Sequence, residues 1–237
     1  MSSSAPSHAL TLYSYWRSSC SWRVRLTLAH KALAYNYEAV HLVREGGQQF
    51  APTYAGLNPM HQVPTLIHEL CDKESESGPS SATKAPQKVC ISQSVAICNY
   101  LEEQFPDAPS IYPKDVIARA KVREIVDTIT SGIQPLQNLA VLRKVGLDKK
   151  IEWGGHWIDI GFQAVEKLLE KSAGKYCVGD SVSLADFCLV PQVYNARRFE
   201  VDLSKFPIIS RIEKDLAELD IFKQAHPNAQ PDAEEAA

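Results

Sequence analysis

The sequence lacks the patterns that would place the chain in a membrane, on a nucleic acid or around a metal ion. No apolar run approaches the roughly 18 residues that suggest a membrane-spanning helix. The net charge is −3, whereas a nucleic-acid-binding surface needs an excess of basic residues. The six cysteines form no Cys-x-x-Cys pair and have no metal-like spacing. The Ser-rich start has no basic region followed by an apolar core, so we expect no secretory signal, a cytoplasmic location and reduced thiols.

The composition is that of a packed globular protein, with 45% hydrophobic and 22% charged residues over 237 positions. In the first third of the chain, β-prone runs alternate with segments whose apolar residues recur at helical spacing. The expected strands cover residues 8–15, 35–42, 63–67 and 89–91, and the expected helices begin near residue 18 and cover 48–57 and 92–105. This order predicts an α/β unit with a parallel strand pair and an antiparallel hairpin.

Two segments poor in large apolar residues interrupt this pattern. Residues 72–88 are rich in Ser, Lys, Glu and Pro, and such a stretch buries too little apolar surface to offset its ordering entropy. We therefore expect a flexible insertion in the hairpin. Three prolines within 106–114 indicate a linker. The predicted domains are an α/β domain over residues 8–105 and an all-helical domain over 115–227.

The pattern beyond the linker is helical throughout. Ser183 and Asp186 have the Ser-x-x-Asp spacing of a capping box, which satisfies the free amides of a helix start. We expect this pair to be structural. The other expected helices cover 117–129, 151–169 and 204–219, and the polar tail over 228–237 is expected to fray.

The chemistry is concentrated where the first strand leads into a helix. Ser18, Ser19 and Cys20 stand at the expected first turn, with Arg17 and Arg23 nearby. Free backbone amides and the positive end of the helix dipole favour an anion at such a position and make a thiol placed there more acidic. From the residues alone, the thiol is either that of Cys20 or one carried by a ligand. Alternatively, the serines only cap the helix and the cysteine fills space.

Two further positions have the form of ligand contacts. Val63-Pro64 begins a strand, and only an X-Pro bond adopts the cis form readily. A cis bond would leave the Val63 backbone free to pair with an extended peptide, whereas a trans bond would only end a loop. Gln93 and Ser94 place an amide and a hydroxyl at another helix start, which suits either a carboxylate or a cap.

Several segments together resemble one family. The segments that carry the resemblance are Ser-Ser-Cys-Ser-Trp-Arg-Val-Arg (18–25), Gly-Gly-Gln-Gln-Phe (46–50), Asn-Pro-Met (58–60), Gln-Val-Pro-Thr-Leu (62–66), Gly-Ile-Gln-Pro-Leu-Gln-Asn-Leu (132–139), Tyr-Cys-Val-Gly-Asp (176–180) and Ala-Asp-Phe-Cys-Leu-Val-Pro-Gln-Val (185–193). From about residue 10 to residue 231, the chain is similar to the zeta class of glutathione transferases.

This resemblance implies a thioredoxin-like α/β domain followed by an all-α domain, with glutathione as the cofactor. It also implies maleylacetoacetate isomerase activity in tyrosine and phenylalanine breakdown, with glutathione transferase side activity on small α-halo acids. The expected partners are glutathione and a small dicarboxylate, and the expected assembly is a homodimer.

The resemblance also assigns site residues. Ser19, Ser18 and Cys20 are the expected catalytic residues, with the thiol of glutathione beside Ser19 and the other two next to it. The rest of the tripeptide is expected to contact four residues of the α/β domain: Gln49 at the glycyl end, the Val63 backbone at the cysteinyl unit, and Gln93 and Ser94 at the γ-glutamyl group.

The helical domain is expected to complete the site. Gln134 and Asn138 would close over the cofactor, and Arg198 would bind a substrate carboxylate, because its planar fork pairs bidentately with carboxylates. The neighbouring Arg197 is either a second substrate contact or a surface charge. His61 is assigned no role.

Two other readings remain. In the first, the chain is a general glutathione transferase or an omega-like thiol transferase in which Cys20 forms a mixed disulfide. In the second, it is a catalytically silent interaction module. Such a module should have lost the thiol-activating segment, which this chain retains.

Overall fold

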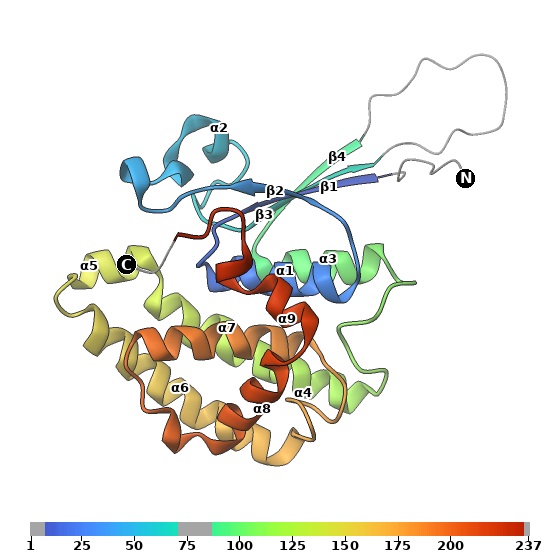
Figure 1. Ribbon diagram of the computed structural model, residues 1–237, viewed down its shortest axis with the longest axis vertical. Coiled ribbons are helices and arrows are strands. Elements are labelled where there is room, and N and C mark those ends of the chain that lie inside the picture. Colours follow the sequence, from blue (N-terminus) through green and yellow to red (C-terminus); the bar gives the residue numbers. More distant parts are fainter. Residues whose placement is uncertain (1–7, 71–86, 235–237) are drawn as a thin grey trace, which may run out of the picture.

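The computed structural model describes residues 8–70 and 87–234. A four-stranded mixed sheet forms the centre of the N-terminal part, in the order β2-β1-β3-β4 (Figure 1). β1 and β2 are parallel, whereas β3 is antiparallel to both β1 and β4, so the expected parallel pair and hairpin are confirmed. The strands are β1 (His8–Ser14), β2 (Asn36–Ala39), β3 (Thr65–Leu70) and β4 (Gln87–Ser92).

Two helices cover the face of this sheet that is turned toward the helical domain, α1 (Ser19–His30) and α3 (Ser94–Gln104) (Figure 1). α1 begins at Ser19 because the Ser18 side chain accepts a hydrogen bond from the Ser21 amide at 3.2 Å and so caps the first turn. The start of α1 therefore lies at the end of β1, where the sequence predicted it.

The helix expected over residues 48–57 is present only in part. The chain instead forms 3₁₀ turns over Arg44–Gly46 and Gln48–Phe50, followed by the short helix α2 (Pro52–Ala55). Pro52 restricts the residue before it to extended backbone, and Ala51 has φ −61° and ψ 139°. A single helix cannot continue through that residue.

The C-terminal part is helical throughout. α4 continues into a π-helical segment (Thr128–Ile133) and a 3₁₀ turn (Gln134–Gln137). The helix α7 is buried along almost its whole length and lies at the centre of the domain (Figure 1). The α-helices are α4 (Val116–Asp127), α5 (Leu139–Val145), α6 (Lys150–Ser172), α7 (Leu184–Arg198), α8 (Pro207–Ala217) and α9 (Asp220–Ala225).

The predicted capping box begins α7. The Ser183 amide donates to the Asp186 carboxylate at 2.8 Å, and the Cys177 amide donates to the same carboxylate at 2.9 Å. Asp186 is fully buried, so these donors replace the water that its carboxylate loses. The pair is structural, as expected.

The two parts of the chain share one hydrophobic core. Leu26 of α1 and Leu101 of α3 belong to the same buried cluster as Phe187 and Leu189 of α7. Because α1 packs directly on α7, the helix that carries the predicted thiol site is held by both parts of the protein.

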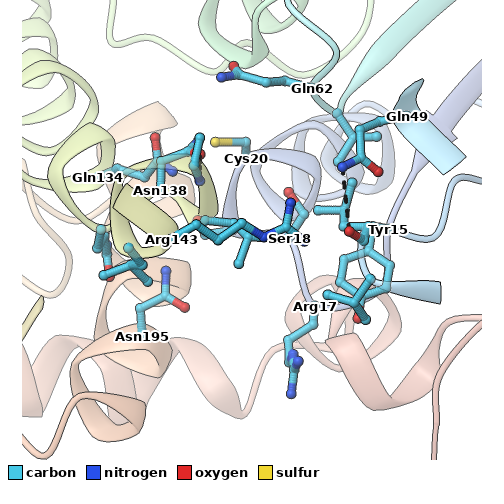
Figure 2. A pocket seen from close by; sticks show the side chains of 18 of the residues that line it. Tyr15, Arg17, Ser18, Cys20, Gln49, Gln62, Gln134, Asn138, Arg143 and Asn195 are labelled. Atoms are coloured by element: carbon cyan, nitrogen blue, oxygen red, sulfur yellow. Dashed lines mark hydrogen bonds between the residues drawn. The ribbon is translucent and has the colours of Figure 1, made fainter. Parts of the chain in front are cut away.

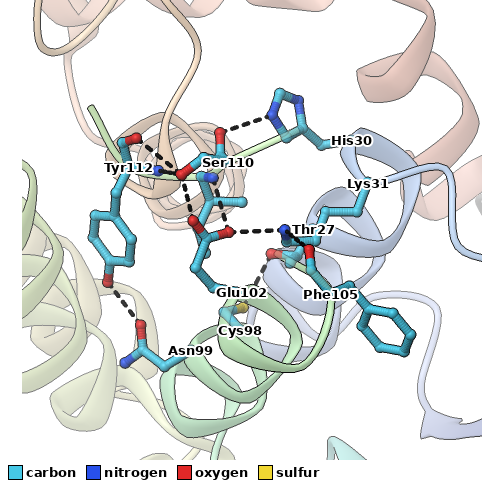
Figure 3. Close-up of polar contacts among 10 residues, drawn as sticks. Thr27, His30, Lys31, Cys98, Asn99, Glu102, Phe105, Ser110 and Tyr112 are labelled. Carbon is cyan, nitrogen blue, oxygen red and sulfur yellow. Dashed lines mark hydrogen bonds and ion pairs between the residues drawn. The ribbon is translucent and has the colours of Figure 1, made fainter. Parts of the chain in front are cut away.

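The predicted linker is bound at several points (Figure 3). Glu102 of α3 forms an ion pair with Lys31 at 2.9 Å and accepts hydrogen bonds from the Ser110 hydroxyl and from the Ile111 amide, the latter at 3.2 Å. The Tyr112 hydroxyl donates to Asn99 of α3 at 2.8 Å. The segment between α3 and α4 is therefore anchored to the α/β part, and the exact domain boundaries stay a prediction.

Two expectations for the C-terminus are wrong. The single helix over 204–219 is divided, because Pro207 starts α8 after a separate 3₁₀ turn (Leu203–Lys205). The tail does not fray within the described residues. Asp232 accepts hydrogen bonds from the Trp16 amide at 3.0 Å and from the Tyr37 hydroxyl at 2.6 Å.

The predicted insertion over 72–88 lies mostly outside the described residues, and its last two residues belong to β4. Across residues 8–70 and 87–234, no helix is long and apolar enough to cross a membrane.

Candidate active site

The predicted site residues meet in two adjoining cavities, of about 290 Å³ and about 280 Å³. The two cavities share Cys20, Gln62, Val63 and Gln134, so we treat them as one composite site. Predicted residues that line the wider cavity are Ser18, Ser19, Cys20, Gln49, Val63, Gln134, Asn138 and Arg198. Gln93 and Ser94 line the narrower one. The structure thus brings all of the predicted site residues together.

The first turn of α1 separates the roles of its two serines. Ser18 is the cap and its hydroxyl accepts from the Ser21 amide, whereas the Ser19 hydroxyl has no hydrogen-bond partner among the described residues. Ser19 lines the wider cavity beside Cys20, at the positive end of the helix dipole. Its hydroxyl is therefore free to donate to an anion in the cavity.

A buried guanidinium stands beneath this turn. Arg23 is 2% exposed, and its Nη1 atom lies 3.7 Å from the Cys20 Sγ atom and 3.2 Å from the Ser94 hydroxyl. Its Nε and Nη2 atoms have no hydrogen-bond partner among the described residues. A buried cation without a paired anion is costly, so this part of the composite site is suited to an anionic ligand.

The opposite wall belongs to the loop before α2. Gln49 is 4% exposed, donates to the Leu42 carbonyl over a long 3.4 Å, and leaves its side-chain oxygen without a partner among the described residues. Gly47 has φ 109°, and a Cβ atom there would lie 2.6 Å from the Gln49 amide nitrogen. L side chains rarely adopt this φ, so the loop beside Gln49 requires glycine at position 47.

The Val63–Pro64 bond is cis. The neighbouring loop is fixed by Asn58, whose side-chain amide donates to the Gln62 carbonyl at 2.7 Å. Neither the N–H nor the C=O of Val63 has a partner in the described part of the chain, although its side chain is buried. Both groups are available to an extended peptide, which is the arrangement that the sequence left open.

The helical domain supplies the third wall (Figure 2). Gln134, from the turn that follows the π-helical segment, lines both cavities. Asn138 also lines the wider cavity, but its side-chain oxygen accepts from the Ala140 amide at 3.0 Å and caps α5. The Asn138 amide nitrogen has no partner among the described residues and can donate to a ligand.

Three arginines line the wider cavity: Arg17, Arg143 and Arg198. The Arg198 side chain is exposed to the open cavity. Desolvation by the protein around its guanidinium lowers its pKa from the usual value, and the nearby charge of Arg17 lowers it further. The sequence analysis missed Arg143, because a basic residue in the last turn of a helix is also what the helix dipole favours. The cluster makes the wider cavity suited to a substrate with more than one carboxylate.

The narrower cavity contains a carboxylate that sequence reasoning also missed. Asp127, the last residue of α4, lines it together with Arg23 and Ser94. No local motif marks Asp127, since its position depends on how α4 packs against α1 and α3. The carboxylate of Asp127 can pair with a ligand's ammonium group, and the guanidinium and hydroxyl can bind its carboxylate. The narrower cavity therefore suits the amino-acid end of a ligand.

The structure also shows the surroundings of Arg197 and His61. Arg197 lines neither part of the composite site and forms a bidentate ion pair with Glu213 at 2.8 and 2.9 Å, which favours the surface-charge alternative. His61 lines the wider cavity, and its Nδ1 atom lies 3.3 Å from the Gln49 carbonyl. Within residues 8–70 and 87–234, no group of three His, Cys, Asp or Glu side chains could hold a metal ion.

Comparisons with known proteins agree with this geometry. Residues 8–103 match the N-terminal domain of glutathione S-transferases, and residues 161–220 match the C-terminal domain. The chain is 53% identical to the probable maleylacetoacetate isomerase 2 of Drosophila melanogaster, covering 93% of this chain and 89% of that protein. It is 50% identical to the maleylacetoacetate isomerase of Mus musculus, covering 93% and 94%.

Among solved structures, the maleylacetoacetate isomerase of Anaeromyxobacter dehalogenans 2CP-1 with bound glutathione superposes with a TM-score of 0.82. It is 42% identical, with 96% of this chain and 99% of that chain covered. A second structure of that protein, with dicarboxyethyl glutathione and citrate in the active site, gives a TM-score of 0.81 at 39% identity, covering 97% and 99%.

The fold and these matches define a two-domain, thioredoxin-like protein, and the chain belongs to the glutathione S-transferase family. Within that family its similarity is to the zeta class. A zeta-class glutathione S-transferase of Euphorbia esula is 42% identical, covering 94% of this chain and 92% of that protein.

Proposed function

We propose that this chain is a glutathione-dependent isomerase that converts maleylacetoacetate to its trans isomer, fumarylacetoacetate, in tyrosine and phenylalanine breakdown. The observation that carries the proposal is the composite site: a free hydroxyl at the start of α1, unpaired groups suited to a tripeptide, and three arginines on the substrate side. Relatives at about half identity are named for this activity.

The groups in the composite site fit glutathione. Its γ-glutamyl end, which carries an ammonium and a carboxylate, matches Asp127, Arg23 and Ser94 in the narrower cavity. The unpaired backbone of Val63 can pair with the cysteinyl unit, and Gln49 faces the glycyl end. The bound thiol then lies at the first turn of α1.

When bound, glutathione supplies a thiolate that adds reversibly to the conjugated double bond, so rotation about the resulting single bond and release of the thiolate give the trans product. The Ser19 hydroxyl donates a hydrogen bond to that sulfur, and the amides of α1 add the positive end of the helix dipole, so both favour the thiolate. Arg198, Arg143 and Arg17 hold the carboxylates of the substrate and fix its double bond over the sulfur.

The test is an assay of the purified chain with maleylacetoacetate, in the presence and absence of glutathione. We expect conversion to the trans isomer only with glutathione, with glutathione not consumed. No conversion, or conversion that is independent of glutathione, would rule out the proposal. Glutathione transfer to small α-halo acids, measured in the same preparation, tests the side activity.

Cys20 supports a second candidate activity, thiol transfer. It lines both cavities and is partly exposed, so a disulfide-bound substrate can reach it. Assaying deglutathionylation beside isomerisation separates the two activities. Cys20→Ala should abolish thiol transfer and leave isomerisation largely intact if Ser19 carries the isomerase reaction.

We also infer a homodimer in the cytoplasm. The dimer is inferred from the resemblance to the family, and five described cysteines without a disulfide are compatible with a reducing compartment. Light scattering of the purified chain and fractionation of cells test these two points.

A further inference from the structure

After α9 the chain returns from the helical domain to the sheet, beside β2 (Figure 1). The buried Gln230 side chain fixes the turn, because its amide donates to the Gln224 and His226 carbonyls, both at 2.9 Å. Residues 232–234 then contact β2, the loop before α1 and the loop that follows β2. We call this three-residue segment the strap.

Asp232 holds the strap to the loop before α1. One carboxylate oxygen accepts from the Trp16 amide at 3.0 Å, and the other accepts from the Tyr37 hydroxyl on β2 at 2.6 Å. The Trp16 carbonyl is held separately by the Arg25 guanidinium, also at 3.0 Å. Trp16 directly precedes Arg17, which lines the wider cavity, so one wall of the composite site is fixed here.

Glu234 contacts the loop that follows β2. Its Oε1 atom lies 2.9 Å from the Nε2 atom of His41 and 2.5 Å from a guanidinium nitrogen of Arg44. The hydrogen bond from His41, and then the charge of Arg44, outweigh desolvation and lower the pKa of Glu234. Its carboxylate is therefore ionised at neutral pH, which strengthens both contacts.

His41 connects this carboxylate to the backbone of the loop. Its ring is buried, and its Nδ1 atom accepts from the Arg44 amide at 2.8 Å and from the Val43 amide at 3.3 Å. The proton of the ring therefore lies on Nε2, which faces Glu234. The His41 amide donates to the Gln48 side chain, and the Gln48 amide donates to the His41 carbonyl, both at 2.8 Å, so the loop is closed on itself.

This loop is the wall at which we place the glycyl end of glutathione. Val43 and Gln49 both line the wider cavity. Ala233, in the middle of the strap, packs against the small buried cluster that includes Val63, another cavity residue. The three residues of the strap line neither cavity, so any effect they have on a ligand passes through these neighbours.

We propose that the strap positions the glycyl wall of the composite site, and that Asp232 and Glu234 are positioning residues for glutathione although neither touches it. Asp232 fixes the strap to β2 and to the loop before α1, and Glu234 holds the His41 loop in place from there. The inference rests on the placement of the glycyl end beside Gln49 in the proposed function.

The test compares two ligands that differ only in the glycine, glutathione and γ-glutamylcysteine, by calorimetric titration of the full chain under reducing conditions. In Glu234→Gln, we expect the Kd for glutathione to rise about threefold, the worth of an exposed ion pair, and the Kd for γ-glutamylcysteine to stay the same. Glu218→Gln removes another exposed carboxylate, one that lies outside both cavities, and should change neither value.

A second variant tests whether the two carboxylates act together. Asp232→Asn leaves one side-chain oxygen for two donors, so the strap should loosen and the preference for glutathione over γ-glutamylcysteine should fall at least as far as in Glu234→Gln. The double variant should lose no more of this preference than Asp232→Asn alone, because both changes release the same segment.

Three results would overturn the proposal: equal weakening of both ligands in Glu234→Gln, glutathione binding that is unchanged in both single variants, or additive losses in the double variant. Circular dichroism shows whether each variant folds. If Asp232→Asn does not fold, Glu234→Gln, a conservative change of an exposed residue, decides alone. The isomerase assay is separate, since a chain that binds glutathione in this way but does not convert maleylacetoacetate would refute the proposed function and leave the strap in place.

Discussion

Arg23 donates to the Ser94 hydroxyl over 3.2 Å, and this contact joins the first turns of α1 to the first residue of α3 beneath the narrower cavity. The guanidinium also reaches Cys20, so one buried group contacts both the Cys20 thiol and the Ser94 hydroxyl, where we propose that the thiol and the γ-glutamyl group of glutathione bind. Two of its nitrogens have no partner among the described residues. We therefore propose that Arg23 positions the cofactor.

Arg23→Gln should raise the Kd for glutathione roughly tenfold, the cost of losing a charged hydrogen bond. Arg23→Lys keeps the charge and should recover part of that affinity. Calorimetric titration with glutathione measures both values, and thermal unfolding shows whether each variant is folded. Two folded variants with the affinity of the natural chain would show that Arg23 supports the core only.

Ser18 and Ser19 offer a matched pair of single-atom changes. Ser18→Ala removes the cap of α1 and should cost about 1 kcal/mol of unfolding free energy, with little effect on the thiol. Ser19→Ala removes an unpaired hydroxyl and should leave stability nearly unchanged. It should raise the pKa of the bound thiol and lower turnover at neutral pH about tenfold, the effect of one pKa unit.

Urea unfolding and the pH dependence of turnover separate these two effects. The Ser19→Ala profile should shift toward higher pH and recover activity there, because the thiolate then forms without the hydroxyl. Full activity of Ser19→Ala at neutral pH would remove that residue from the mechanism.

Arg198 and Arg197 are adjacent on α7 but have different surroundings. Arg198→Ala should raise KM for a dicarboxylate substrate roughly tenfold with a smaller change in kcat, because it removes a binding interaction. Arg197→Ala breaks only an ion pair with Glu213 outside the composite site, and its KM should stay the same. Equal KM values in the two variants would contradict the role given to Arg198.

The sequence was sufficient where the signal is local. The Ser183–Asp186 pair satisfies helix amides within its own first turn, so its role depends on only a few neighbouring residues. The alternation of strands and helices likewise follows from the spacing of apolar residues, which is why the order of elements up to α3 was predictable.

Interactions between distant segments were not predictable. Asp127 and Arg143 enter the composite site only through the packing of α4 and α5, and no motif marks either residue. The polar composition of the tail predicts fraying, yet the Asp232 carboxylate accepts a hydrogen bond from the Trp16 amide, 216 residues away. The composition of a segment indicates how much apolar area it can bury, but not which hydrogen-bond donors its carboxylates contact in the folded protein.

Glu102 provides a pH-dependent test of how the linker is anchored. Burial acts to raise its pKa, but the Lys31 ammonium and the Ser110 and Ile111 donors outweigh burial, so the pKa is lowered from the usual 4.5. A lowered pKa in the folded state means that the carboxylate adds stability above the unfolded-state value and loses it as pH falls through the folded-state value.

Glu102→Gln should therefore cost about 1–2 kcal/mol near neutral pH, typical of hydrogen bonds to a charged group. The difference from the natural chain should shrink as pH falls from 4.5 through the lowered pKa of folded Glu102, because the carboxylate is protonated over that range. Urea unfolding across this pH range measures it, and Glu103→Gln, a change of the exposed neighbouring residue, should show no comparable difference at any pH. A Glu102→Gln cost that stays constant with pH would mean that the carboxylate charge does not hold the linker.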